Sequence, residues 1–179
     1  HRIIDIDNFE KNEGLSTIWN RCLDNTKSKY VCFINTDAFV TRGWLEKMMQ
    51  TMINKEETGV VGPSGDNVYK DQGDKSENII YSDKHENILQ HISGYCMLTL
   101  KTDVRFPKEV PFYSNDLAYG VLMMDEGYNL VHRTDAYVYH LDQKSQTEAE
   151  HTRLGQEGII AYDKWRLNRK EIKLPIEYI

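Results

Sequence analysis

The sequence predicts an α/β fold with a largely parallel sheet flanked by helices and a helical tail at the C-terminus. Apolar runs of strand length alternate along the chain with amphipathic stretches of helical spacing, which is typical of an α/β domain. The chain has 179 residues, of which 40% are hydrophobic and 28% charged, so it is long enough for one substantial core. We expect one domain, with its core over residues 1–145 and a helical extension over residues 146–179.

The first half of the chain alternates between strand-like and helix-like stretches. The isoleucines at residues 3–6 predict a short strand, and apolar residues recur at helical spacing over residues 15–23. Tyr30–Ile34 is a nearly unbroken apolar run, which is typical of a central strand covered on both faces. A second amphipathic helix is expected over residues 45–53, with methionines on its buried side, and a short strand at residues 60–61.

The second half starts with a long polar stretch. Residues 64–84 are rich in Asp, Lys, Asn and Gly, and a loop of that length is usually functional, which suggests a lid over a site. Thr147 and Glu150 have the spacing of a capping box that opens a polar helix towards Pro175. Between these stretches we expect strands over residues 95–100, 130–132 and 136–140, and a helix over residues 117–126 that Gly127 stops.

Composition and charge argue against two classes of function. The net charge of −6 disfavours a nucleic-acid-binding protein, and no apolar run approaches the ~20 residues of a transmembrane helix.

The cysteines, Cys22, Cys32 and Cys96, lie far apart within apolar stretches and lack the spacing of a metal site. They are expected to be buried free thiols in a reducing compartment, which indicates the cytoplasm, including the cytoplasmic face of a membrane.

Two side chains at predicted strand ends are candidate metal ligands. Asp37, in Asn35-Thr36-Asp37, directly follows the apolar run Tyr30–Ile34, and ligands of open α/β sheets bind beyond the carboxyl ends of strands. A carboxylate there can hold a divalent cation that neutralises a departing diphosphate, although an Asp after a strand is also common in turns and caps. His140 ends the last predicted strand, where imidazole suits manganese-type cations, but a lone histidine is often structural.

Asp116 is the candidate for proton transfer. It follows Ser114-Asn115 at the predicted start of a helix, where the helix dipole and free N–H groups keep a carboxylate ionised. An ionised carboxylate can accept the proton of an attacking hydroxyl during sugar transfer. A plain N-cap needs the same residue at the same place, so both interpretations stay open. His85 and His91 are interpreted as surface or packing residues.

The order of these segments resembles that of family 2 glycosyltransferases over residues 8–140. The stretch YVCFINTD at residues 30–37 is similar to the strand that delivers the family's D-x-D motif, and Asn115-Asp116 falls where the family has a Glu-Asp pair. No single piece is specific, but their order and spacing are. The other matching pieces are Asn12-Glu13-Gly14 and Asn20 for the N-x-G and downstream Asn, Trp44-Leu45 for the helix after D-x-D, residues 93–98 for the glycine-led acceptor strand, and Gly127-Tyr128 with residues 138–140 for the Gly-Tyr and late His.

The resemblance implies a GT-A-like (Rossmann-like) fold and an inverting glycosyltransferase. Such an enzyme would move a sugar from a nucleoside diphosphate sugar to a hydroxyl of a glycan, lipid or protein acceptor. The resemblance makes Asp116 the catalytic base and has Asp37 and His140 hold Mn2+ or Mg2+, while Gly94 would let the acceptor approach closely. The implied donor-side residues are Asn12, Gly14, Asn20, Asn35, Thr36 and Asp37, and the implied acceptor-side residues are Gly94, Tyr95 and Asn115.

Three departures from the family pattern keep an alternative open. Asn35 replaces the first D-x-D carboxylate, Asn115 replaces the Glu, and the sequence enters at residues 3–6, without the first strands that grip the nucleotide. The expected sheet edge would be exposed, to be covered by a homo-oligomer partner or a larger parent chain. The alternative is a non-catalytic binding or scaffold module, or a fragment of a larger glycosyltransferase. A nucleotidyltransferase is disfavoured because no glycine- and lysine-rich phosphate loop stands near the start.

Overall fold

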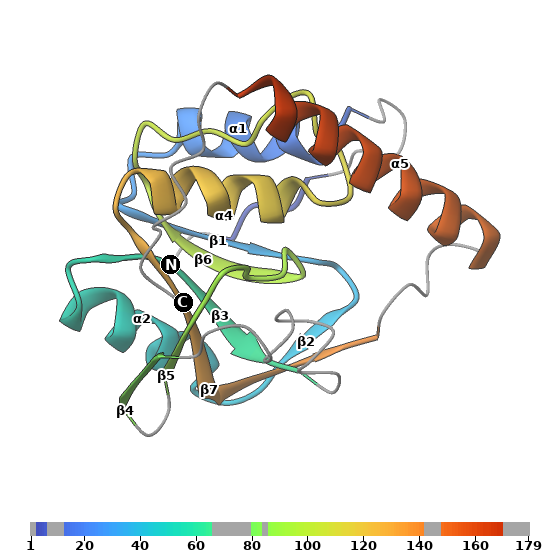
Figure 1. Ribbon diagram of the computed structural model, residues 1–179. Coiled ribbons are helices and arrows are strands. Elements are labelled where there is room, and N and C mark those ends of the chain that lie inside the picture. Colours follow the sequence, from blue (N-terminus) through green and yellow to red (C-terminus); the bar gives the residue numbers. More distant parts are fainter. Residues whose placement is uncertain (1–2, 7–12, 66–79, 84–85, 142–147, 170–179) are drawn as a thin grey trace.

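The computed structural model describes residues 3–6, 13–65, 80–83, 86–141 and 148–169. These residues form a sheet with helices on both faces, as Figure 1 shows, so the predicted α/β fold is confirmed. Asn12, Thr147 and most of the expected lid lie outside the described residues. In chain order the elements are α1 (Leu15–Asn25), β1 (Tyr30–Ile34), β2 (Ala38–Val40), α2 (Trp44–Asn54), β3 (Thr58–Ser64), β4 (Ile80–Asp83), β5 (Glu86–Leu89), β6 (Cys96–Leu100), α4 (Asn115–Asp125), β7 (Asn129–His140) and α5 (Glu148–Asn168).

The sheet is mixed. Its strand order is β1-β6-β3-β7-β5-β4, and β2 pairs with β7 outside this path. Among the described strands, β3 and β7 are the only parallel pair, and the other pairs are antiparallel. The expectation of a largely parallel sheet is therefore wrong. Neighbouring parallel strands need a crossover connection, which is usually a helix. The chain passes from β5 to β6 without a helix, and β6 lies antiparallel between β1 and β3.

Helices α1 and α4 pack on one face of the sheet, and α2 packs on the other (Figure 1). On the first face, Trp19 of α1 stacks on Phe33 of β1 with ring centroids 5.0 Å apart, and Phe106 packs edge-on against both rings. On the second face, Met48 and Met52 of α2 are buried against the sheet. The two amphipathic helices predicted in the first half are confirmed, because the apolar face of each supplies one core.

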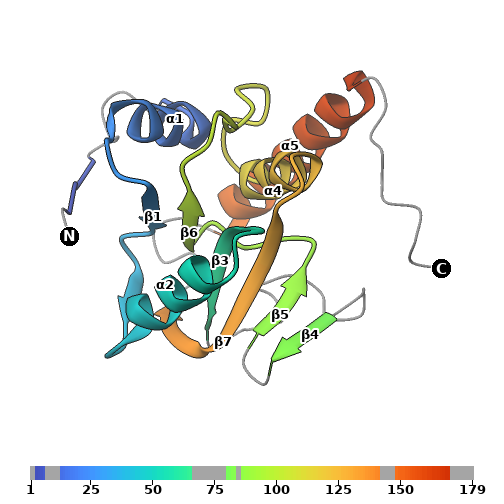
Figure 2. The same cartoon turned by 90° about the vertical axis from the view of Figure 1, so that its left-hand side faces the viewer.

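The N-terminal part of the sheet differs from the prediction. Residues 3–6 form no strand, and the Ile3 side chain is 93% exposed. Tyr30–Ile34 is an edge strand of the described sheet, as Figure 2 shows, and Phe33 alone among its residues is buried. The prediction of a central strand was wrong because an apolar run indicates that a strand is covered by helices but not how many strands lie beside it.

β7 is one strand that changes partners partway along. Its first part pairs with β3 as far as Arg133 opposite Pro63, and the next residue of β3, Ser64, lies opposite Tyr137. Residues 134–136 therefore form a bulge, after which the strand pairs with β2. Two separate strands were predicted here because the polar residues at the bulge look like a break. Strands β2, β4 and β5 were not predicted, since each is short and the polar pattern around it is typical of loops.

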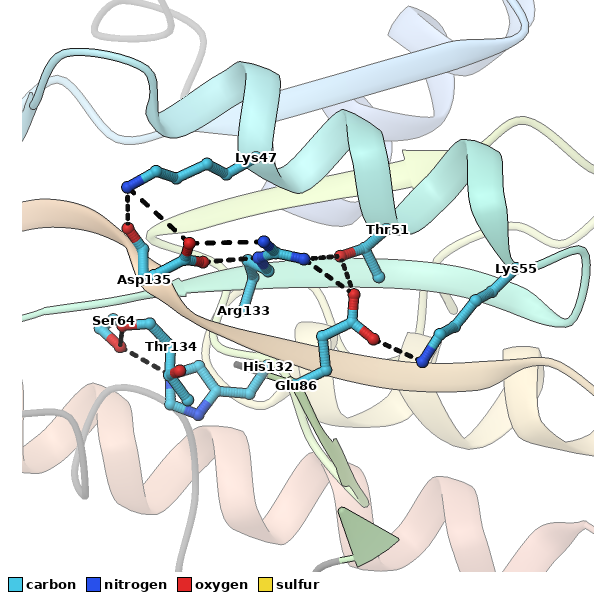
Figure 3. A network of polar contacts seen from close by, with 9 residues as sticks. All are labelled: Lys47, Thr51, Lys55, Ser64, Glu86, His132, Arg133, Thr134 and Asp135. Carbon is cyan, nitrogen blue, oxygen red and sulfur yellow. Dashed lines mark hydrogen bonds and ion pairs between the residues drawn. The ribbon is translucent and has the colours of Figure 1, made fainter. Parts of the chain in front are cut away.

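A network of charged side chains holds this bulge against α2 and β5 (Figure 3). Arg133 donates hydrogen bonds to Glu86 Oε1 at 2.9 Å and to Asp135 Oδ1 at 2.5 Å. Lys47 of α2 donates to the carbonyl oxygen of Asp135 at 2.5 Å. The bulge is therefore fixed on both sides, and with it the course of β7 towards its last residue, His140.

Glu86 is the buried centre of that network. It is 2% exposed, forms an ion pair with Lys55 and accepts a hydrogen bond from Thr51 at 2.6 Å. Burial would raise the pKa of Glu86, but Lys55, Thr51 and Arg133 together outweigh burial and lower it. Because the folded pKa lies below the unfolded one, Glu86 contributes stability at neutral pH that is lost as the pH falls through the folded pKa.

Candidate active site

Asp37 and His140 meet beyond the carboxyl end of β1. Asp37 lies in the turn between β1 and β2, where the Ala38 N–H donates to the Asn35 carbonyl at 3.2 Å. Ala38 lies opposite His140 in the ladder, and the Leu141 N–H donates to the Asp37 carbonyl at 3.1 Å. As a result, His140 Nε2 lies 3.4 Å from Asp37 Oδ1. The two side chains that the sequence suggested as metal ligands are thus brought together.

Tyr95 supports the imidazole of His140. The two rings stack with centroids 4.6 Å apart and an interplanar angle of 18°. Tyr95 is 2% exposed, its hydroxyl donates to the Pro63 carbonyl at 3.3 Å, and its own carbonyl accepts the Asn35 N–H at 2.8 Å. The resemblance suggested Tyr95 as an acceptor-side residue, whereas the structure buries it behind His140.

Asp116 is held by backbone N–H groups on both carboxylate oxygens. Oδ2 accepts the Gly94 N–H at 2.7 Å, and Oδ1 accepts the Leu117 N–H at 2.8 Å. His91 Nε2 lies 3.2 Å from Oδ2. Burial would raise the pKa of Asp116, but His91 and the two N–H groups outweigh burial and lower it. Asp116 is therefore a carboxylate at neutral pH, in line with the sequence-based argument that it is kept ionised.

His91 is the contact that sequence reasoning missed. It was interpreted as a surface or packing residue, but its Nε2 is buried and faces Asp116. Burial would lower the pKa of His91, and the Asp116 carboxylate outweighs burial and raises it. The only hint in the sequence is that His91 stands three residues before Gly94. The hydrophobic periodicity of a segment carries no information about a partner on a distant helix.

The first turn of α4 aims Asp116 towards Gly94. Ser114, just before the helix, has φ 66° and ψ 7°, a left-handed conformation that is uncommon for residues other than glycine. Asn115 is 3% exposed, and its Oδ1 accepts the Asp116 N–H at 3.0 Å. Asn115 was expected on the acceptor side. The structure buries it, and its side-chain oxygen accepts a backbone N–H at the start of the helix.

Gly94 lies between Trp19 and Asp116. A β-carbon at this position would lie 2.8 Å from Trp19 Cη2 and 3.3 Å from both Cβ and Oδ2 of Asp116. Close packing inside the chain, rather than close approach of an acceptor, thus explains the glycine. Gly94 contacts Asp116 and its neighbour Tyr95 contacts His140, so a single dipeptide connects the candidate base with the candidate metal ligands.

Two residues expected on the donor side make structural contacts. A β-carbon on Gly14 would lie 2.5 Å from Pro111 Cβ, so α1 begins tightly against the segment before α4. The Asn20 side chain donates to the Phe106 carbonyl and accepts the Phe106 N–H, both at 2.8 Å. Asn20 therefore uses its amide to hold a loop of the chain, beside the aromatic cluster of the first core.

The Asp37–His140 pair suits a divalent cation that a diphosphate helps to hold. Mg2+ binds ligands at about 2.1 Å, so two adjacent ligands on one cation lie roughly 3 Å apart, close to the 3.4 Å between Oδ1 and Nε2. Asn35 and Thr36 are exposed in the same turn. Within the described part of the chain, no three His, Cys, Asp or Glu side chains converge, so a cation here would complete its shell with water and phosphate oxygens.

The sequence match decides the family. The sequence model of glycosyl transferase family 2 matches residues 2–113, which is more than half of the chain. The chain belongs to glycosyl transferase family 2. The match includes Asp37 and Gly94 and ends before Asp116 and His140, so the placement of the latter two rests on the structure. No curated protein matches the sequence.

Solved structures agree with the fold of this family 2 domain. The mannosyltransferase PcManGT from Pyrobaculum calidifontis, in complex with GDP-Man and Mn2+, matches with a TM-score of 0.65 at 16% identity over 89% of this chain and 45% of that chain. A mycobacterial protein matches with a TM-score of 0.56 at 13% identity over 84% of this chain and 51% of that chain. The likeness shows a GT-A fold, and the chain spans about half the length of these neighbours.

The remaining sequence predictions concern the cysteines and the membrane. Cys96 is buried and Cys22 and Cys32 are partly buried, and all three are free thiols. Burial raises the pKa of Cys22 and of Cys96, so both thiols stay protonated at neutral pH. Among the helices that the structure describes, none combines the length and the apolarity needed to cross a bilayer.

Proposed function

We propose that this family 2 domain is an inverting glycosyltransferase that uses a nucleoside diphosphate sugar and a divalent cation. The observation that carries the proposal is the Gly94-Tyr95 dipeptide, which contacts a fixed carboxylate on one side and the ring of His140 on the other. A single displacement needs a base and an anchored diphosphate on either side of one anomeric carbon. The two groups contact adjacent residues, and in this proposal they serve the same anomeric carbon.

On the donor side, Asp37 and His140 would hold Mn2+ or Mg2+ together with the diphosphate. The bound cation offsets the negative charge that develops on the leaving diphosphate. Asn35 and Thr36, which are exposed in the same turn, would contact the donor. The mannosyltransferase neighbour was solved with GDP-Man and Mn2+, which makes a guanosine nucleotide the first to test.

On the acceptor side, Asp116 would take the proton of an acceptor hydroxyl as its oxygen attacks the anomeric carbon. The lowered pKa of Asp116 keeps it ready to accept a proton at neutral pH. The hydrogen bonds from Gly94 and Leu117 fix the direction of its lone pairs before the substrate arrives. A base that is already oriented needs no rearrangement during the reaction.

A sugar-nucleotide-binding module without catalysis is the second candidate. One observation favours it: Asn35 stands where the family has a carboxylate, and among the described residues no third His, Cys, Asp or Glu joins Asp37 and His140. Such a module would bind the nucleotide and release no product.

Calorimetric titration with GDP, UDP and dTDP, with and without Mn2+, tests the donor site. We expect one nucleotide to bind more tightly with Mn2+. We expect Asp37→Ala to weaken that binding at least about tenfold, because it removes one of the two protein ligands. Asp163→Ala, which changes an exposed aspartate of α5, is the matched control and should bind like the wild type.

Product analysis separates the two candidates. The enzyme should release nucleoside diphosphate from the matching nucleotide sugar in the presence of an acceptor, and NMR of the product should show the inverted anomeric configuration. Mn2+-dependent binding without release would favour the binding module. A retained configuration would contradict the single displacement, and a folded protein that binds none of the three nucleotides would contradict the donor site.

A further inference from the structure

The two oxygens of the Asp116 carboxylate are in different situations. A carboxylate has about four lone-pair positions, two on each oxygen. Oδ2 accepts the Gly94 N–H at 2.7 Å and lies 3.2 Å from His91 Nε2, which is at ion-pair distance but outside hydrogen-bond geometry. Oδ1 accepts only the Leu117 N–H among the described residues, at 2.8 Å, and keeps one position for another donor. The side chain is 17% exposed.

His91 and Gly94 together determine which oxygen is engaged. His91 lies on the segment after β5, three residues before Gly94, and both approach Asp116 from that segment. The carboxylate is held at both oxygens, because Oδ2 accepts the Gly94 N–H at 2.7 Å and Oδ1 accepts the Leu117 N–H at 2.8 Å. Rotation of the carboxylate would break contacts to two elements at once.

Resting on the proposed function, we propose that His91 is the positioning residue of the base: it engages Oδ2 of Asp116 and leaves Oδ1 as the oxygen that accepts the proton of the sugar acceptor. In the transfer step, the O–H bond of the acceptor breaks and its proton moves to Oδ1. The acceptor oxygen forms a bond to the anomeric carbon, and the bond from that carbon to the donor oxygen breaks, with its electron pair leaving on the nucleoside diphosphate. His91 touches neither substrate and acts through Asp116.

His91 and Asp116 also shift the pKa of each other. Asp116 raises the pKa of His91 and His91 lowers the pKa of Asp116, in each case against the effect of burial. Among the described residues, Asp116 is the charged side chain that raises the pKa of His91, and His91 is the one that lowers the pKa of Asp116. The coupling can therefore be measured by changing one partner and titrating the other.

NMR titration of the His91 ring tests the pair without any need for catalysis. In the wild type the pKa of His91 should lie above that of an ordinary histidine. In Asp116→Asn it should fall below the ordinary value, because burial then acts alone. An unchanged His91 pKa in Asp116→Asn would overturn the proposal. If that variant unfolds, titration of the Asp116 carboxyl carbon in His91→Gln gives the same answer, with the Asp116 pKa expected to rise.

The pH profile of transfer tests the positioning role. In His91→Gln we expect kcat/KM to fall about 10- to 100-fold and its acid limb to move to higher pH, since Asp116 would then protonate more readily. Binding of the nucleotide with Mn2+ should not change. His91→Ala, which removes every donor, should lose more activity than His91→Gln, and Arg153→Gln on the exposed face of α5 should match the wild type.

The outcomes distinguish this inference from the proposed function. A uniform loss of kcat/KM in His91→Gln with an unmoved acid limb would show a merely structural role and overturn the inference. A wild type that binds nucleotide and transfers no sugar would overturn the proposed function and, with it, the catalytic part of the inference. The coupled titration of His91 and Asp116 would then still be decided by NMR.

Discussion

Two Asp–His pairs lie on either side of Gly94-Tyr95, and they differ in how the chain holds the carboxylate. Both oxygens of Asp116 accept backbone N–H groups, and its side chain is 17% exposed. The Asp37 carboxylate has His140 as its one polar side-chain partner in the described part of the chain, and it is 24% exposed. The first carboxylate is therefore oriented in advance, whereas the second keeps oxygens available for a ligand.

This difference teaches that the same two residue types can serve opposite purposes. A base benefits from a fixed orientation, because an oriented group needs no rearrangement in the transition state. A Mg2+ or Mn2+ site needs oxygens that can adapt to an octahedral shell shared with phosphates and water. The surroundings of the two aspartates, more than their sequence motifs, support the two roles that we propose.

The largest expected effect comes from Asp116→Asn. It keeps the shape of the side chain and removes its basicity, so the rate of sugar transfer should fall about 10²- to 10⁴-fold. Nucleotide binding with Mn2+, measured by calorimetry, should be unchanged. If Asp116→Asn weakens nucleotide binding as much as Asp37→Ala does, the two pairs do not have separate roles.

A smaller effect is expected from Gly94→Ala, which acts on the Asp116 side of the dipeptide. The new β-carbon would press on the Trp19 ring and on Asp116, and such overpacking typically costs about 1–3 kcal/mol. Denaturant unfolding followed by tryptophan fluorescence should show a lower midpoint, and transfer should slow because the base is displaced. Unchanged stability would mean that the gap between α1 and α4 is looser than these distances indicate.

The smallest effect is expected from Tyr95→Phe. It removes the hydrogen bond to the Pro63 carbonyl and keeps the ring that stacks on His140. The free energy of unfolding should fall by about 1 kcal/mol, and Mn2+-dependent nucleotide binding should persist. Tyr95→Leu provides the contrast, because it removes the stacked ring as well and should weaken that binding. Equal binding by both variants would show that the stack does not support His140.

Local patterns predicted much of the fold. The apolar faces of α1 and α2 have helical spacing, and Gly127, with φ 87°, ends α4 as expected. The direction of β6 and the continuity of β7 were not predicted, because they depend on pairing between distant segments. The polar residues Arg133, just before the β7 bulge, and Asp135, within it, look like a loop in the sequence, and in the structure Glu86 and Lys47 hold them.

The residue types of the candidate site were predicted from the sequence, but most of the contacts between them were not. Asp37, Asp116 and His140 were identified from motif order, which records the composition of a site but not its contacts. His91 and the packing reason for Gly94 were missed, because each depends on a side chain from another helix. Asn20 and Tyr95 were expected near ligands. In the structure, Asn20 forms hydrogen bonds with the Phe106 backbone and Tyr95 stacks on the His140 ring.

The left-handed turn at Ser114 has a consequence for how the chain would respond to selection. A residue with a β-carbon in this conformation costs roughly 1–2 kcal/mol, in a protein whose total stability is on the order of 5–15 kcal/mol. Asparagine and glycine adopt the conformation more readily. Selection for heat resistance alone should therefore replace Ser114, while selection for activity as well should allow only replacements that leave Asp116 aimed at Gly94.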